Sequence, residues 1–148
     1  MTAMISIKRP AKLTRPLYVE ESGAIGPGLV FLPGLGGTTR YWQGRLTPLE
    51  QSYQILLVDP LGFGQSPQPW TRYTVERHVD TLHRSLAGRA PCILTGHSMG
   101  AILSMAYAAR YPEQVERLVL LGLPYFGNRE QTIRYFRNGP FLERWVLT

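Results

Sequence analysis

The sequence predicts an α/β protein whose mostly parallel sheet carries helices on both faces. Apolar runs of strand length alternate along the chain with amphipathic stretches of helix length, the order typical of such a sheet. These runs are continuous rather than interleaved with polar residues, which indicates strands covered on both faces. The 148 residues are enough for one domain, and 44% hydrophobic against 18% charged residues excludes a disordered chain.

Four apolar runs predict the buried strands, and a weaker run predicts a further strand ahead of them. The four runs are residues 29–32, 55–58, 92–94 and 118–121, and the weaker one is 17–19. Each is rich in Val, Ile or Leu and has the length of a strand rather than of a helix. We therefore expect these five segments to form one sheet.

A helix is expected after Thr38 or Thr39, either of which can cap its first turn. Its apolar stripe recurs at the i, i+4 and i+7 positions of one helical face. The stripe consists of Trp42, Leu46 and Leu49. Pro48 should disturb the last turn of this helix.

Two further helices are predicted. The first has a stripe of four apolar residues and is closed by Gly88. Its stripe is Val75, Val79, Leu82 and Leu86. The second runs over residues 99–111, is rich in alanine, and stops because Pro112 biases the preceding residue away from helical geometry.

The segment after Gly122 is rich in aromatic residues. The six rings are Tyr125, Phe126, Tyr135, Phe136, Phe141 and Trp145. Asn128 can begin a helix and Asn138-Gly139 can end it. The rings either open a helical cap over an apolar pocket or bury a helix against the sheet.

Charge and cysteine content exclude several classes of protein. The net charge of +6 raises the possibility of nucleic-acid binding, but the basic residues are scattered from Lys8 to Arg144 without a cluster, so we expect no nucleic-acid partner. The single cysteine, Cys92, can form neither an intramolecular disulfide nor a cysteine-rich metal site, which favours a reducing compartment and a cytoplasmic location. No apolar run has the length of a signal peptide core or a membrane span. We expect no metal, cofactor or membrane partner.

The most informative segment runs from a predicted strand through Gly96-His97-Ser98-Met99-Gly100 directly into a predicted helix. This Gly-x-Ser-x-Gly pattern, with a strand before it and a helix after it, is typical of a serine held on a sharp turn as an exposed nucleophile. Gly96 and Gly100 are expected to be glycine because strand and helix must pass closely there. Ser98 is the candidate catalytic residue.

A glycine-rich loop follows the predicted strand at 29–32. It contains Gly34, Leu35 and Gly36. Such a loop could be a plain tight turn or a phosphate cradle, but neither the Gly-x-Gly-x-x-Gly nor the Walker pattern fits. Paired with Ser98, it can turn a backbone N–H towards the nucleophile, and we assign the two donors of an oxyanion hole to Leu35 and Met99.

These segments resemble the first half of an α/β-hydrolase-fold protein. The likeness covers the loop at 32–37, with Pro33 where the family commonly has His, the Val58-to-Ser66 segment, and the Gly96-to-Gly100 turn. The resemblance implies that residues 1–122 are the amino-terminal part of a hydrolase core whose carboxyl-terminal strands are missing. Residues 123–148 would then be the start of a truncated helical cap.

In this fold the serine is followed in the chain by an acid and then by a histidine. No Asp and no His follows Ser98 in this sequence. His97 should point away from the nucleophile, and His78 and His83 should be half-exposed on a helix. We therefore expect the acid and the base to lie outside this chain.

The resemblance implies a serine hydrolase that acts on a small, largely apolar ester or a related acyl or C–C substrate. The chain alone should be weakly active, and a second chain or the missing carboxyl-terminal half would complete it. The alternative is a non-catalytic binding module that keeps the fold and the pocket. Residues 118–121 should form an exposed apolar edge strand.

Overall fold

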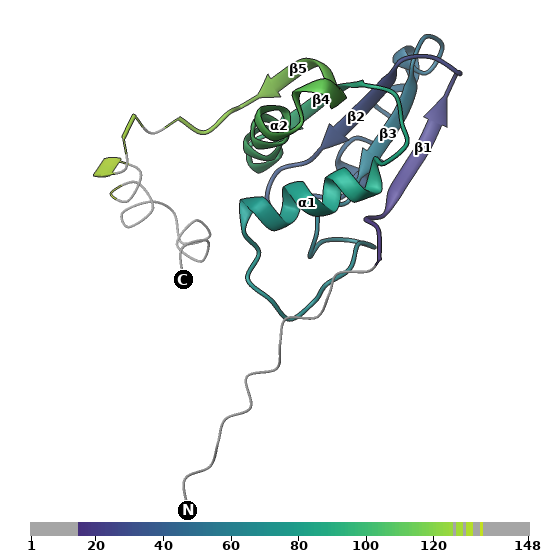
Figure 1. Ribbon diagram of the computed structural model, residues 1–148. Helices are drawn as coiled ribbons and strands as arrows, with labels where there is room; N and C mark the ends of the chain where they lie inside the picture. Colours follow the sequence, from purple (N-terminus) through teal and green to yellow (C-terminus); the bar gives the residue numbers. More distant parts are fainter. Residues whose placement is uncertain (1–14, 126, 129, 132–133, 135–148) are drawn as a thin grey trace, which may run out of the picture.

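The computed structural model describes residues 15–125, 127–128, 130–131 and 134. This part of the chain forms strands and helices in alternation (Figure 1). Their order is β1 (Val19–Gly23), β2 (Gly28–Leu32), β3 (Gln54–Val58), α1 (Val75–Ser85), β4 (Cys92–His97), α2 (Met99–Arg110) and β5 (Val115–Leu121). Three short 3₁₀ helices complete the set: η1 (Thr39–Tyr41), η2 (Thr47–Leu49) and η3 (Pro112–Gln114).

The strands form one sheet in the order β1-β3-β2-β4-β5. The pairs β3–β2, β2–β4 and β4–β5 are parallel, and only β1 runs antiparallel, against β3. The predicted α/β class with a mostly parallel sheet is confirmed. Because β2, β3, β4 and β5 run the same way, the loops that follow them emerge at one edge of the sheet.

The first strand begins later than the sequence predicts. Leu17, where the prediction starts it, is buried ahead of β1, and its N–H donates to Ser85 Oγ at the end of α1 over 2.8 Å. The apolar run at 17–19 therefore contains a residue that ties the chain to the end of α1 and, after it, the start of the strand.

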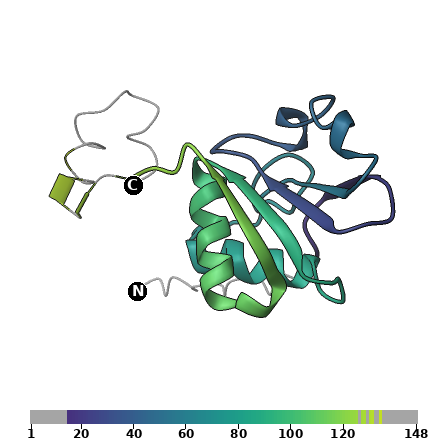
Figure 2. The same ribbon diagram turned by 90° about the horizontal axis from the view of Figure 1, so that it is seen from above.

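Both α-helices pack on the same face of the sheet (Figure 2). Alternate strand residues point to this face. They include Val30 and Leu32 of β2, Leu56 and Val58 of β3, and Cys92 and Leu94 of β4. These side chains meet an apolar stripe from α1 and α2 that contains Val79, Leu82, Leu86, Leu103 and Tyr107.

The opposite face is covered by the segment that holds η1 and η2. Trp42 is buried there against Phe31 of β2, with the ring centroids 5.0 Å apart. The prediction of one continuous helix in this segment is wrong. Gly44 takes a φ of +71°, which an α-helix does not allow, and Pro48 lies in the first turn of the separate 3₁₀ helix η2. The predicted stripe is real, but two 3₁₀ turns present it.

The two predicted α-helices are confirmed. The Thr74 side chain caps α1 by accepting the Arg77 N–H, and the left-handed Gly88 follows the end of this helix. Helix α2 ends before Pro112, as expected. Most of residues 123–148, where the cap is expected, lie outside the described residues.

Strand β5 lies at one edge of the described sheet, as the sequence predicts for its apolar run. Leu118, Val119 and Leu121 are 38%, 40% and 42% exposed. On the other side of the strand, β4 pairs with it from Cys92↔Val115 to His97↔Leu121. The strand is therefore paired along one edge while its side chains remain accessible.

The prediction that His78 is half-exposed is wrong. His78 is buried in α1, with only 7% of its surface accessible. Its ring lies near that of Tyr73, just before α1, with the centroids 6.2 Å apart. Burial lowers the pKa of His78, because the charged imidazolium loses its hydration. The folded protein therefore prefers neutral His78.

This burial predicts a pH dependence of stability. Unfolded His78 takes up a proton near pH 6.5, whereas the folded protein takes it up only at lower pH, so the free energy of unfolding should fall as pH decreases from about 6.5 towards the folded-state pKa. Urea unfolding between pH 7.5 and 5.5 measures this slope. His78→Gln and His78→Phe should both flatten it, and an unchanged slope in both variants would contradict the assignment.

Candidate active site

Ser98 occupies the turn between β4 and α2. Its backbone has φ +53° and ψ −114°, and in the described part of the chain it is the only non-glycine residue with positive φ. The Ser98 N–H donates to the Leu121 carbonyl over 2.9 Å, while its own carbonyl accepts from Ala101 and Ile102 at the start of α2. The unfavourable conformation is thus held by hydrogen bonds on both sides.

Gly96 and Gly100 permit this turn by their lack of side chains. A Cβ atom on Gly96 would overlap the Gly100 carbonyl and lie 2.6 Å from the Ala101 nitrogen. A Cβ atom on Gly100 would overlap the Leu32 carbonyl and lie 2.6 Å from the Pro33 carbonyl oxygen. The close passage predicted between strand and helix is present at Gly96, and at Gly100 the close neighbour is the end of β2.

The glycine-rich loop after β2 lies directly against the Ser98 turn. The Gly37 N–H donates to the Gly34 carbonyl over 3.0 Å and closes a tight turn around Leu35 and Gly36. Gly36 has a φ of +74°, which favours glycine. A Cβ atom on Gly34 would lie 3.4 Å from Ser98 Cβ.

Two backbone N–H groups, those of Leu35 in the loop beside Ser98 and of Met99 next to it in the chain, have no acceptor within the described part of the chain. The N–H of Leu35 donates to no acceptor among the described residues, and this residue is 52% exposed. Met99 is the first residue of α2, where the N–H has no partner within the helix. Such groups can receive the developing negative charge of a bound ligand.

Asp59 fastens the loop after β3 to η1. It is 1% exposed, and its two carboxylate oxygens accept the Thr39 N–H over 2.6 Å and the Gln65 N–H over 2.7 Å. The Ser66 hydroxyl donates to the Asp59 carbonyl and accepts the Tyr18 N–H. Asp59 therefore anchors its loop, and it also holds η1, a link that no local sequence pattern indicates.

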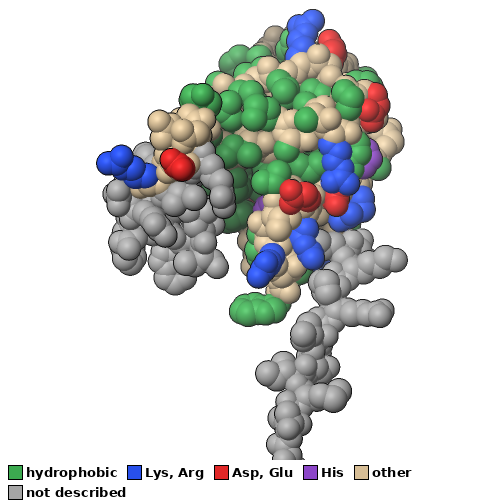
Figure 3. Space-filling model, turned by 60° about the vertical axis from the view of Figure 1, so that its left-hand side comes forward, with side chains coloured by type: hydrophobic (Ala, Val, Ile, Leu, Met, Phe, Trp, Pro, Cys, Tyr) green, Lys and Arg blue, Asp and Glu red, His purple; other side chains and the backbone are tan. Residues whose placement is uncertain are grey.

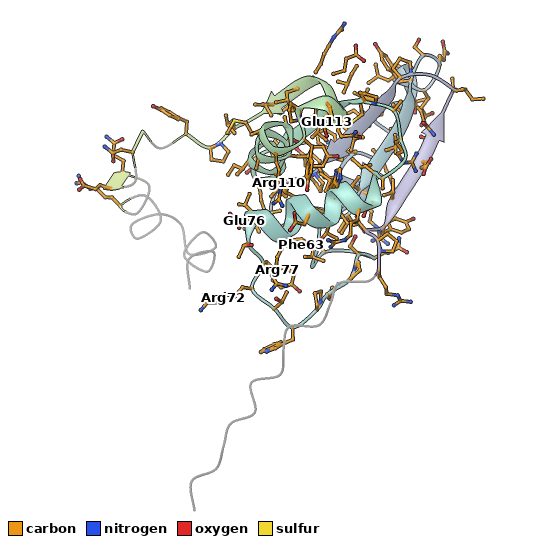
Figure 4. All side chains as sticks on the ribbon, viewed as in Figure 1. Phe63, Arg72, Glu76, Arg77, Arg110 and Glu113 are labelled. Atoms are coloured by element: carbon orange, nitrogen blue, oxygen red, sulfur yellow. The ribbon has the colours of Figure 1, made fainter. Side chains whose placement is uncertain are left out.

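No histidine or carboxylate of the described residues hydrogen-bonds Ser98. His83 stacks on Tyr111 with 3.8 Å between ring centroids, at the end of α2 remote from the Ser98 turn. His97 stacks on Tyr41 over 5.3 Å. Glu113 follows α2 in η3, where Figure 4 shows it beyond the end of the helix. That the acid and the base of the triad lie outside this chain stays a prediction.

Cys92 is buried in β4 and is not a second nucleophile. Its thiol lies 3.6 Å from the Gln114 carbonyl. Burial raises its pKa to about 11, so the thiol stays protonated at neutral pH.

Three exposed apolar residues belong to segments that touch the Ser98 turn. They are Leu35, Tyr41 and Leu121. Figure 3 turns the side on which β5 ends towards the viewer and shows hydrophobic side chains over much of the upper surface, with charged side chains at its top and right and also lower down. This surface suits an apolar ligand better than a highly charged one.

Comparison with known proteins decides the family. A family model described as the alpha/beta hydrolase fold matches residues 27–144. The chain belongs to the alpha/beta hydrolase fold family. Within this family it is 34% identical over 110 residues to "Putative carbamate hydrolase RutD" of Shigella flexneri serotype X (strain 2002017), covering 72% of this chain and 40% of that protein. It is also 33% identical over 107 residues to "Probable lysophospholipase BODYGUARD 1" of Arabidopsis thaliana, covering 66% of this chain and 23% of that protein.

Solved hydrolase structures share the fold. The structure of E-2-(acetamidomethylene)succinate hydrolase is 31% identical with a TM-score of 0.71, covering 82% of this chain and 46% of that one. A carboxylesterase structure from Nitrososphaera gargenis is 25% identical with a TM-score of 0.72, covering 82% and 47%. This alpha/beta hydrolase chain thus spans less than half the length of these relatives. In its described part, no helix has the length and apolar character needed to cross a membrane.

The close contact at Gly100 predicts that alanine there destabilises the protein, the opposite of its usual effect in a helix. Alanine normally stabilises a helix by about 1 kcal/mol relative to glycine. Here Gly100→Ala should instead lower the free energy of unfolding by about 2–3 kcal/mol, because the new methyl meets two backbone carbonyls of the β2 end. Urea unfolding measures the change.

Gly28→Ala is the matched control. A methyl at Gly28 would make ordinary contacts of 3.6 Å with Cys92 Cβ and 3.7 Å with Leu56 Cδ1. This variant should keep the stability of the wild type. If Gly100→Ala is as stable as Gly28→Ala, the tight passage is absent.

Proposed function

We propose that the chain carries the nucleophile half of a serine hydrolase that acts on a small, largely apolar ester or a related acyl or C–C substrate. Ser98 is the nucleophile, and the Leu35 and Met99 N–H groups form the oxyanion hole. Gly34, Gly36, Gly96 and Gly100 allow the backbone geometry. The partner is a small molecule, the protein acts in the cytoplasm, and the reaction needs no metal or cofactor.

The conformation of Ser98 is the observation that carries this proposal. A serine at φ +53° is costly, and such strain persists where the surrounding structure fixes it, commonly at functional sites. The Leu35 and Met99 N–H groups, which have no acceptor among the described residues, support the same assignment. Membership of a hydrolase-rich family and relatives named as hydrolases support the same conclusion.

The proposed reaction begins with attack of Ser98 Oγ on the substrate carbonyl carbon. The C–O π electrons move to the carbonyl oxygen, and the resulting oxyanion accepts hydrogen bonds from Leu35 and Met99. A base removes the serine proton and delivers it to the leaving group as that bond breaks, and water then hydrolyses the acyl-enzyme. No described residue supplies this base to Ser98, so we propose that it comes from outside residues 1–148, on a longer chain or a second one.

A non-catalytic binding module is the second candidate. The observation that favours it is the lack of any histidine or carboxylate bonded to Ser98 in the described part of the chain. Both candidates keep the same pocket, but only the hydrolase requires Ser98 to react. Covalent chemistry at Ser98 therefore distinguishes them.

A fluorophosphonate probe should label Ser98. Without its base the serine reacts slowly, so the labelling rate should rise with added imidazole, which can serve as an external general base in an open site. Mass spectrometry of the labelled peptide identifies the site. Ser98→Ala should abolish labelling, whereas Ser104→Ala, at a fully buried serine in α2, should leave it unchanged. Imidazole-independent labelling that persists in Ser98→Ala would refute the hydrolase assignment.

The chain alone should show little turnover of nitrophenyl esters. Removing the base of a comparable triad costs on the order of 10⁶ in turnover rate, while binding and the oxyanion hole retain ~10³ to 10⁴ over water. A steady-state assay of the purified chain measures this remainder. Vigorous Ser98-dependent hydrolysis that is lost in His78→Ala or His83→Ala would overturn our placement of the base.

A further inference from the structure

The imidazole of His97 lies beneath the loop that carries Leu35. His97 ends β4 and alternates with Gly96, so its side chain points to the η1 face of the sheet, as does Ile93 in the same strand. There its ring stacks on Tyr41 of η1, with centroids 5.3 Å apart and planes inclined by 15°. One flat ring thus joins the nucleophile strand to the segment on the far face.

The two ring nitrogens of His97 face two different loops. A Cβ atom on Gly34 would lie only 3.1 Å from Nδ1, closer than side chains normally pack. A Cβ atom on Gly122, just after β5, would lie 3.5 Å from Nε2, an ordinary contact. The preceding residue, Leu121, accepts the Ser98 N–H, so both loops that touch the ring also touch the Ser98 turn.

His97 does not hold these loops by hydrogen bonds. Its Nδ1 is buried and has no hydrogen-bond partner among the described residues. Within the described residues, the His97 ring therefore interacts with these loops by van der Waals packing rather than by hydrogen bonds. Gly34 lies next to both side chains: a Cβ atom on it would be 3.1 Å from His97 Nδ1 and 3.4 Å from Ser98 Cβ.

We propose that His97 is a positioning residue that sets the separation between the Leu35 N–H and Ser98. The ring acts as a rigid spacer under Gly34, with Tyr41 supporting its other surface. This inference rests on the proposed function in assigning a role to Leu35, but the spacer contact itself can be tested without any reaction.

A double-mutant cycle between residues 34 and 97 tests the spacer. Gly34 has no positive φ, so alanine can adopt its backbone conformation. The new methyl of Gly34→Ala would be too close only to His97 Nδ1, because its distance of 3.4 Å from Ser98 Cβ is an ordinary contact. Gly34→Ala should therefore displace the loop in the wild-type background and not in His97→Ala. His97→Phe, which keeps a flat ring, should retain the clash.

Hydrogen exchange of the Gly37 amide reports the loop directly, because this N–H closes the turn on the Gly34 carbonyl. The Val30 amide in β2 reports global opening. Gly34→Ala and His97→Ala should each accelerate Gly37 exchange about tenfold without changing Val30 exchange, and the double variant should be no faster than His97→Ala. If His97→Ala does not fold, His97→Ser carries the same comparison.

Fluorophosphonate labelling at fixed imidazole gives the functional readout. A displaced oxyanion donor should lower the limiting labelling rate about tenfold in His97→Ala while the half-saturating probe concentration stays constant, and His97→Phe should restore the rate. Additive effects of the two substitutions on Gly37 exchange would overturn the spacer. Absence of labelling in the wild type would refute the proposed function and leave the exchange result to decide the spacer.

Discussion

The close packing of the first turn of α2 against the ends of β2 and β4 is the constraint on which the candidate site depends. Gly100 brings the helix to the Leu32 and Pro33 carbonyls, and Gly96 brings the strand to the Gly100 carbonyl. With helix and strand this close, the single residue at the apex of the turn must take a positive φ. The turn thus presents Ser98, which is partly buried, beside the amino terminus of α2.

The remaining parts of the site are held to this turn from separate directions. The Leu121 carbonyl at the end of β5 binds the Ser98 N–H. Asp59 at the end of β3 binds the Thr39 N–H, and so fixes the start of η1, the 3₁₀ helix that contains Tyr41. A buried carboxylate without partners would be strongly unfavourable, so these two backbone bonds also stabilise Asp59 itself. The parallel sheet places all of these strand ends at one edge.

Much of this arrangement could be predicted from sequence because it follows from local pattern. The continuous apolar runs predicted β2, β3, β4 and β5, and the glycines around Ser98 predicted a turn whose close contacts are now visible. Long-range packing could not be predicted. The stripe of Trp42, Leu46 and Leu49 fits a helix, but Gly44 interrupts it, and Trp42 is buried while Leu46 and Leu49 pack partly buried against the same cluster. His78 is buried although it lies off the apolar stripe of α1, and only packing of the folded chain shows this.

A crystal structure of the Ser98 phosphonate adduct would test the central claim most directly, since the phosphonyl oxygen stands in for the oxyanion of an acyl-transfer intermediate. The claim is that the Ser98 turn and the loop after β2 together form one site that binds negative charge. The account predicts that this oxygen lies within about 3.1 Å of both the Leu35 and the Met99 nitrogen. An adduct whose oxygen faces solvent and meets neither N–H would contradict it.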